Sequence, residues 1–195
     1  MVDFASLPTA EQTRQLGKLE GDVGADVGLR MNRINSNITE SVYTGLRPAA
    51  CMDGLEIGFG NGQLLPDLLS YAEGLKYVGI DISSTMVDEA RHFNAPLVAT
   101  GQAAFHLASA EDIPSGPASF DRVFAVNVIY FWANPHRPLE EVRASCGPAA
   151  SVSLPRSHRR RRPASRASPS SLMRNSAGPA GKPWPRSYHL VVAQP

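Results

Sequence analysis

Three glycines in alternation follow a short apolar segment, and they could bind a ligand through the backbone. Residues 55–62 read LEIGFGNG, with Gly58, Gly60 and Gly62 between a predicted strand and a predicted helix. Glycine adopts the unusual dihedrals of such a turn and lets a ligand approach the backbone closely. The following helix start offers free N–H groups and a partial positive charge. The spacing differs from that of dinucleotide and phosphate loops, and an ordinary tight turn is the alternative.

An acid at the end of the next predicted strand strengthens the ligand interpretation. Asp81 ends the apolar segment 76–81 and lies 23 residues after Gly58. A carboxylate at that point of an α/β fold accepts hydrogen bonds from ribose hydroxyls. The alternative is a helix-capping role beside Ser83, and one residue can serve both roles.

The elements that must position these residues alternate along the chain. Strands are expected at 53–58, 76–81, 104–108 and 119–128, and a glycine-rich loop at 17–28. Helices are expected at 29–46 and 63–71, from Ser83 or Ser84 to Phe93, and from 138 onward. This alternation predicts an α/β fold with a doubly wound, mostly parallel sheet. A ligand then lies beyond the carboxyl ends of the strands.

The charge of the chain divides it into two parts. The 195 residues carry a formal net charge of +1, yet residues 1–143 carry −8 and residues 144–195 carry +9. The apolar runs are too short for a transmembrane helix. Two cysteines without metal-ligand spacing indicate free thiols and a cytoplasmic location. His92, His106 and His136 also lack metal spacing, so no metal is expected.

Four ordered segments resemble class I S-adenosylmethionine-dependent methyltransferases: EIGFGNG, YVGIDIS, AEDIP and SFDRVFAVNVIYF. The resemblance is nearest to the small-molecule enzymes of ubiquinone and menaquinone biosynthesis, and it covers about residues 20–143. Residues 31–35 (MNRIN) also resemble the helix that such enzymes hold over the methyl donor. The resemblance implies a Rossmann-like fold, S-adenosylmethionine as cofactor and methyl transfer to a small-molecule acceptor.

The resemblance also implies a role for each matching residue. Gly58, Gly60 and Gly62 would pass under the methionyl part of the donor, and Glu56 would bind its amine. Asp81 would hold the ribose. The other implied cofactor-binding residues are Ile82 and Met86 beside the adenosine, Ser109, Ala110 and Glu111 at the adenine edge, and Asn127 with Tyr130 after the fourth strand. The helical spacing of Met86 with Ile82 and Ala90, taken alone, favours core packing over ligand contact.

Catalysis needs little from the protein if the methyl group is already activated. In-line placement of the acceptor supplies most of the effect, and a base is needed only if the acceptor loses a proton. His136 and Tyr130 are the candidates, and no catalytic residue is assigned. The fourth strand is followed by NVIYFW rather than an Asn/Asp-Pro-Pro-aromatic run or a Pro-Cys pair. This favours a small-molecule acceptor over nucleobases or glutamine.

The last 52 residues depart from the family pattern. After Arg143 the chain reads ASCGPAA, and one coding of this string, read two bases on, gives Val-Leu-Arg-Pro-Gly-Gly, the expected family turn. We therefore hypothesise a frameshifted reading of a GC-rich gene from about Ala144. The alternative is that residues 158–162 (HRRRR) form a nucleic-acid-binding arm.

The sequence thus predicts an N-terminal helical cap at 1–50, a donor-binding α/β core at 51–143 and a disordered basic tail at 144–195. Without family-like C-terminal strands, the edge of the fourth strand would be open and prone to aggregation. Residues 188–192 (YHLVV) could pair as a strand. The predicted function is methyl transfer from S-adenosylmethionine to a small molecule. The alternatives are an inactive donor-binding remnant and a nucleic-acid binder. Membrane association is not expected.

Overall fold

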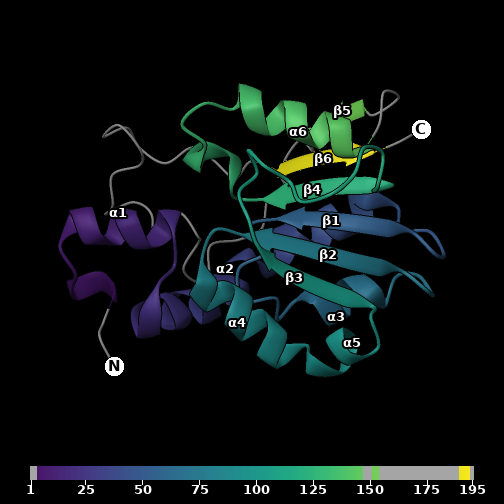
Figure 1. Cartoon of the computed structure of the whole chain (residues 1–195). Helices are drawn as coiled ribbons and strands as arrows, with labels where there is room; N and C mark the ends of the chain where they lie inside the picture. Colours follow the sequence, from purple (N-terminus) through teal and green to yellow (C-terminus); the bar gives the residue numbers. More distant parts are fainter. Residues whose placement is uncertain (1–3, 147–150, 154–188, 194–195) are drawn as a thin grey trace, which may run out of the picture.

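The computed structural model describes residues 4–146, 151–153 and 189–193. Its centre is a six-stranded sheet in the order β3-β2-β1-β4-β6-β5 (Figure 1). The first four strands in this order run parallel: β1 (Asp53–Ile57), β2 (Lys76–Asp81), β3 (Ala103–Leu107) and β4 (Arg122–Val126). The doubly wound parallel sheet expected from the sequence is therefore confirmed, with β1 and β4 adjacent at its centre.

Helices cover both faces of the sheet. One face packs against α2 (Gly21–Leu46), α3 (Leu65–Leu69) and α4 (Ser84–Phe93), and α5 (Ala95–Ala99) follows α4. The other face packs against α6 (His136–Cys146). Two short 3-10 helices, Phe4–Ser6 and Ile129–Phe131, and the helix α1 (Thr9–Gly17) complete the described helical elements.

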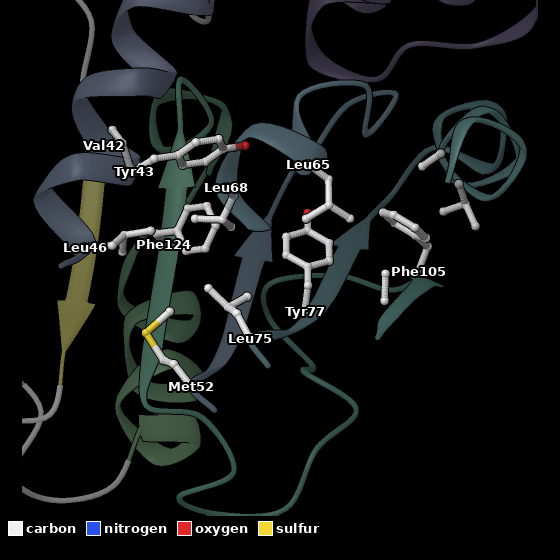
Figure 2. Packing of buried hydrophobic residues seen from close by; sticks show 13 residues of the cluster. Val42, Tyr43, Leu46, Met52, Leu65, Leu68, Leu75, Tyr77, Phe105 and Phe124 are labelled. Atoms are coloured by element: carbon white, nitrogen blue, oxygen red, sulfur yellow. The ribbon is translucent and has the colours of Figure 1, made fainter. Parts of the chain in front are cut away.

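Alternation along the strands separates two hydrophobic clusters. Leu55 and Ile57 of β1 face the α6 side, where they join the cluster that contains Val142 and Cys146. Phe124 of β4 faces the opposite side, and its ring packs edge-on against Tyr43 of α2 with centroids 6.0 Å apart (Figure 2). Successive strand residues point to opposite faces, so each strand contributes to both clusters.

The glycines of residues 17–28 do not form the expected loop. Helix α2 begins at Gly21, eight residues before the expected start at residue 29. Gly24 is buried, and a Cβ there would lie 2.6 Å from the backbone carbon of Leu19. A Cβ on Gly28 would lie 3.3 Å from the sulfur of Met86. These glycines lie inside the helix and permit neighbouring segments to pack closely against it.

Other boundaries differ by a few residues. Ser83 is the N-cap of α4, and its side chain accepts a hydrogen bond from the Met86 N–H at 3.1 Å. Helix α6 runs through Ala144 to Cys146, so the proposed frame junction lies inside a helix. The backbone N–H of Phe120 donates to the Ser145 carbonyl at 3.1 Å, which ties this last turn to the segment before β4. The short helix α5 was not expected.

The edge of β4 is covered, which corrects the expectation of missing C-terminal strands and an open edge. Strand β6 (His189–Ala193) pairs antiparallel with β4, and β5 (Ser151–Ser153) pairs with β6. The ladder satisfies the backbone N–H and C=O groups that an open edge would expose. The basic run at 158–162 and the rest of the tail lie outside the described residues.

Candidate functional site

The turn after β1 is built from three glycines with positive φ. Gly58, Gly60 and Gly62 have φ values of 71°, 64° and 66°. A Cβ on Gly58 would lie 2.4 Å from a methyl group of Val128, and one on Gly62 would lie 2.8 Å from the Cβ of Ala90. Around Gly60 nothing lies within 4 Å of the Cβ position. Two of the glycines therefore permit close packing, and the middle one faces open space.

Two carboxylates flank this turn at the ends of β1 and β2. Glu56 is buried, and the Tyr77 hydroxyl donates a 2.8 Å hydrogen bond to its Oε2. Asp81 accepts hydrogen bonds from the backbone N–H of Ser83 at 2.9 Å and of Gly60 at 3.3 Å. Asp81 thus binds the backbone of the residue that caps α4 and reaches the glycine turn, whereas the N-cap itself is Ser83.

Burial changes the acidity of both carboxyl groups. Desolvation raises the pKa of Glu56 to about 7, opposed by the Tyr77 hydrogen bond and assisted by the charge of Asp81. Desolvation also raises the pKa of Asp81 to about 6, opposed chiefly by the backbone N–H of Ser83 and Gly60. A cationic or hydrogen-bond-donating ligand would favour the charged form of both groups. The site therefore holds two buried carboxyl groups whose charged forms would be stabilised by a ligand with a positive charge or hydroxyl groups.

A cavity of about 420 Å³ opens at the carboxyl ends of the parallel strands. It is lined by Gly58, Gly60 and Asp81 at the strand ends. Residues of α1, of α2 and of the turn between these two helices also line it. A smaller cavity of about 80 Å³ lies beside the same turn, between Glu56 and Tyr43. The large cavity is rich in apolar side chains: Leu16, Leu19, Met31, Ile57, Ile80, Ile82, Met86, Val126, Val128, Phe131 and Trp132.

Amide side chains join helix α2 to the strand ends around the cavity. Asn32 Nδ2 donates to Asn61 Oδ1 at 2.8 Å, which connects α2 to the glycine turn. Asn127 Nδ2 donates to Asn35 Oδ1 at 3.0 Å, which connects the end of β4 to the next turn of the same helix. Asn127 has a φ of 57°, a left-handed conformation that asparagine tolerates better than most residues. These bonds fix the helix over the cavity.

The turn between α1 and α2 is joined to the start of α4. The Ser83 hydroxyl donates to the Leu19 carbonyl, and the Gly21 N–H donates to the Thr85 hydroxyl at 2.9 Å. Leu19 and the neighbouring Lys18 both line the large cavity. The N-terminal helices are therefore part of the cavity wall rather than a separate appendage.

The structure brings together nearly all of the residues that the resemblance singled out. The large cavity is lined by Gly58, Gly60, Asp81, Ile82, Met86, Ser109, Ala110, Glu111 and Asn127. The small cavity is lined by Glu56, Gly58, Gly60 and Gly62. Tyr130 lines neither, and its ring packs against Phe131 with centroids 4.7 Å apart. His136 is exposed at the start of α6 and also lines neither cavity.

The sequence predicted an N-terminal cap and a site residue after the fourth strand, but it did not single out the individual cavity residues of α1, of the turn after it, or of the 3-10 helix after β4. Leu16, Lys18 and Leu19 line the cavity, as do Phe131 and Trp132, and a Cβ on Gly17 would lie 3.5 Å from the Phe131 ring. The only sequence signal was the apolar run after Asn127, which a buried strand end explains equally well. Among the described residues, no group of three or more His, Cys, Asp or Glu side chains could hold a metal ion.

Comparison with known proteins identifies the family. Residues 55–152, half of the chain, match the model of the methyltransferase domain, and the chain belongs to this family. The matched segment contains the glycine turn, Asp81 and β4. The expected Rossmann-like methyltransferase fold is thus confirmed.

The chain is similar to curated proteins that are named O-methyltransferases. An O-methyltransferase of Aspergillus sclerotiorum is 23% identical over 124 residues, which cover 64% of this chain and 47% of that protein. The chain spans less than half the length of the curated relatives it matches.

Solved structures share the fold at low identity. A complex of the Trm112 methyltransferase activator and a methyltransferase from Haloferax volcanii matches with a TM-score of 0.58 and 22% identity, covering 66% of this chain and 56% of that one. An S-adenosylmethionine-dependent methyltransferase from Aquifex aeolicus matches with a TM-score of 0.51 and 20% identity, covering 78% and 86%. None of the described helices has the length and apolar character needed to cross a membrane.

Proposed function

We propose that this chain binds S-adenosylmethionine at the glycine turn and directs its methyl group to a small-molecule acceptor. The observation that carries the proposal is the open space above Gly60 between two carboxylates, Glu56 and Asp81, at the carboxyl ends of adjacent parallel strands. The residues fit the group, because a Cβ at Gly60 would enter free space that a ligand could occupy. Membership of the methyltransferase domain family supports the same donor.

Each residue of the donor site would have a defined task. Gly58, Gly60 and Gly62 would let the methionyl part lie against the backbone, and Glu56 would pair with its amine. Asp81 would accept hydrogen bonds from the ribose hydroxyls. The remaining donor contacts would come from Ile82 and Met86 at the adenosine, Ser109, Ala110 and Glu111 at the adenine edge, and Asn127 after β4. Tyr130, which lines neither cavity, is left out of this set. When bound, the donor supplies an activated methyl group.

The acceptor would lie between the cap and the segment after β4. Leu16, Met31, Phe131 and Trp132 line this part of the cavity and would exclude water around an apolar molecule. The names of the curated relatives, all O-methyltransferases, favour an oxygen atom as the methyl acceptor. In-line orientation of that oxygen is the main contribution expected of the protein. Neither His136 nor Tyr130 lines either cavity, so we propose neither residue as a general base.

We also propose a three-part organisation and a cytoplasmic location. Residues 1–50 would form the cap, 51–143 the donor-binding core and 144–195 the basic tail, of which β5 and β6 extend the sheet. The two cysteines support a reducing compartment, because Cys51 and Cys146 are not joined in a disulfide bond.

Calorimetric titration with S-adenosylhomocysteine tests the donor site. The wild-type protein should bind, and Asp81→Asn should lose about tenfold or more in affinity, because a charge-assisted hydrogen bond is removed. Asp88→Asn, an exposed residue on α4, is the matched control and should bind like wild type. Soluble wild-type protein that fails to bind would refute the proposal. Binding without turnover on phenolic or carboxylic acceptors would favour the donor-binding remnant instead.

A further inference from the structure

A buried carboxylate beside the glycine turn is held on one side only. Glu56 is 6% exposed and lies on the face of the sheet that packs against α2 and α3. Its Oε2 accepts the hydrogen bond from the Tyr77 hydroxyl at 2.8 Å. Within the described part of the chain, Oε1 makes no hydrogen bond, and Glu56 lines the small cavity. One oxygen is therefore fixed by the protein, and the other remains for a ligand.

The hydroxyl of Tyr77 reaches Glu56 because a glycine separates them. Gly79 pairs in register with Glu56 of β1 on one side and with Phe105 of β3 on the other. Tyr77 lies two residues earlier on the same strand and so faces the same side of the sheet. A Cβ on Gly79 would lie 3.0 Å from the Tyr77 hydroxyl oxygen and 2.6 Å from the Phe59 ring. Any larger residue at position 79 would disturb this arrangement.

Aromatic neighbours fix the direction of the Tyr77 side chain. The ring is 2% exposed and lies near Leu65 and Leu75, with Phe105 beyond it (Figure 2). The centroids of Tyr77 and Phe105 are 5.7 Å apart, and those of Phe59 and Phe105 are 5.1 Å apart. Such pairs stabilise a defined ring orientation. The hydroxyl is therefore presented to Glu56 by a packed cluster rather than by a mobile side chain.

We propose that Tyr77 is a positioning residue of the donor site, which holds Glu56 Oε2 across the gap left by Gly79 so that Oε1 meets the ligand. The inference deepens the proposed function, because the amine that Glu56 would bind belongs to the proposed donor. A buried tyrosine that merely fills space would affect folding but would not control the ionisation of one carboxyl group.

The electrostatic surroundings give the hydroxyl this control. Desolvation is the main cause that raises the pKa of Glu56, and the Tyr77 hydrogen bond is what lowers it again. Asp81 of β2 adds a repulsive charge. Tyr43 of α2 also faces Glu56, and Asp67 of α3 faces Tyr43 in turn. Since these other groups are acids or phenols, loss of the Tyr77 hydroxyl would leave the carboxylate with less compensation for burial.

The direct experiment follows the Glu56 carboxyl carbon by NMR in ligand-free protein labelled with 13C-glutamate, from pH 5 to pH 9. Glu56→Gln identifies its resonance. Tyr77→Phe should raise the titration midpoint by about one pH unit, because it removes a hydrogen bond to a charged group. Gly79→Ala should raise the midpoint in the same direction by displacing the hydroxyl. About half of the Glu56 carboxyl group is ionised near pH 7 in the wild-type protein, and a smaller fraction would be ionised in Tyr77→Phe. The affinity of Tyr77→Phe for S-adenosylhomocysteine should therefore be roughly fivefold below that of the wild type at pH 7 and should recover near pH 9.

Two controls match these substitutions. Tyr71→Phe removes the hydroxyl of an exposed tyrosine, and Gly54→Ala adds a methyl group at ordinary contact distance on β1. Neither should move the midpoint. A wild-type midpoint in Tyr77→Phe overturns the inference, even if that variant is less stable. If Tyr77→Phe does not fold, the wild-type protein decides, because the bonded Tyr77 hydroxyl proton should exchange slowly and show a nuclear Overhauser effect to Glu56. Rapid exchange without that contact also overturns it.

Failure of the proposed function would look different. Wild-type protein that binds no S-adenosylhomocysteine at any pH contradicts the donor site, whereas the carboxyl titration still reports whether Tyr77 controls Glu56.

Discussion

Gly60 and Gly101 form a matched pair that separates a binding role from a structural one. Their φ values are 64° and 71°, and a Cβ on either would meet nothing within 4 Å. Alanine at either position therefore costs only the left-handed backbone penalty, about 1–2 kcal/mol. Gly60 lines both cavities, whereas Gly101 lies before β3 and lines neither. The two variants should thus lose equal stability and differ in ligand binding.

Gly62→Ala shows how much more stability a substitution in the same turn costs when the new methyl group also meets neighbouring atoms. Its φ is 66°, so alanine there carries the same backbone penalty. The new methyl group would also lie 2.8 Å from the Cβ of Ala90 and 3.0 Å from the amide nitrogen of Asn94. Overpacking of this kind adds about 1–3 kcal/mol. The total, roughly 2–5 kcal/mol, is a large part of the 5–15 kcal/mol that stabilises a typical domain.

Urea denaturation and calorimetry with S-adenosylhomocysteine measure the two effects. Gly60→Ala and Gly101→Ala should each lower the free energy of unfolding by about 1–2 kcal/mol, and Gly62→Ala by more. Gly60→Ala should weaken binding by about tenfold to a hundredfold, because the new methyl group enters the space that the ligand would occupy. Gly101→Ala should bind like the wild type. Equal affinity of Gly60→Ala and Gly101→Ala would falsify the assignment of the glycine turn as the donor wall.

Five further results are expected. Between about pH 4 and pH 7 the ligand-free protein should become less stable as pH rises, because burial raises the pKa values of Glu56 and Asp81 to about 7 and about 6 and the folded state retains their protons. Over the same range affinity for S-adenosylhomocysteine should rise as the carboxylates form, and a flat affinity profile would contradict this. Asn35→Ala should lower stability by about 1–3 kcal/mol in urea, because it leaves the Asn127 amide without its partner, whereas exposed Asn37→Ala should not. Val191→Pro should promote aggregation in light scattering, because it removes an N–H in the strand between β4 and β5; Val191→Ala keeps the N–H and should remain soluble. Genomic sequencing across codons 140–150 tests the frameshift hypothesis, which fails if the alternative frame after Arg143 encodes no apolar strand pattern.

Local patterns were sufficient for the core of the fold. The strand at 76–81 is observed with the expected bounds, and Ser83 caps the following helix as one of the two expected candidates. Period-two apolar segments and the glycine turn depend on residues close in sequence, so they can be read without knowledge of distant contacts. The same holds for Asp81, whose strand-end position is set by its own strand.

Distant contacts decided what the local patterns could not. Gly28 resembled a loop residue, yet it lies inside α2, where the side chain of Met86 packs against it from α4. Residues 189–193 had no strand partner within reach in the sequence, and they pair with β4 only because the sheet brings the two segments together. Helix and strand propensities are weak where tertiary contacts compete with them.

The sequence by itself determined the class of fold and which residues stand near the strand ends, because the alternation of strands and helices and the turn chemistry follow from short-range patterns. Only the tertiary structure decided how those residues are used. It brought the α1 side chains and the segment after β4 to one cavity, and it joined Tyr77 to Glu56 across Gly79. The physical reason is that burial and hydrogen-bond geometry arise between neighbouring strands and layers, where residues far apart in sequence first meet.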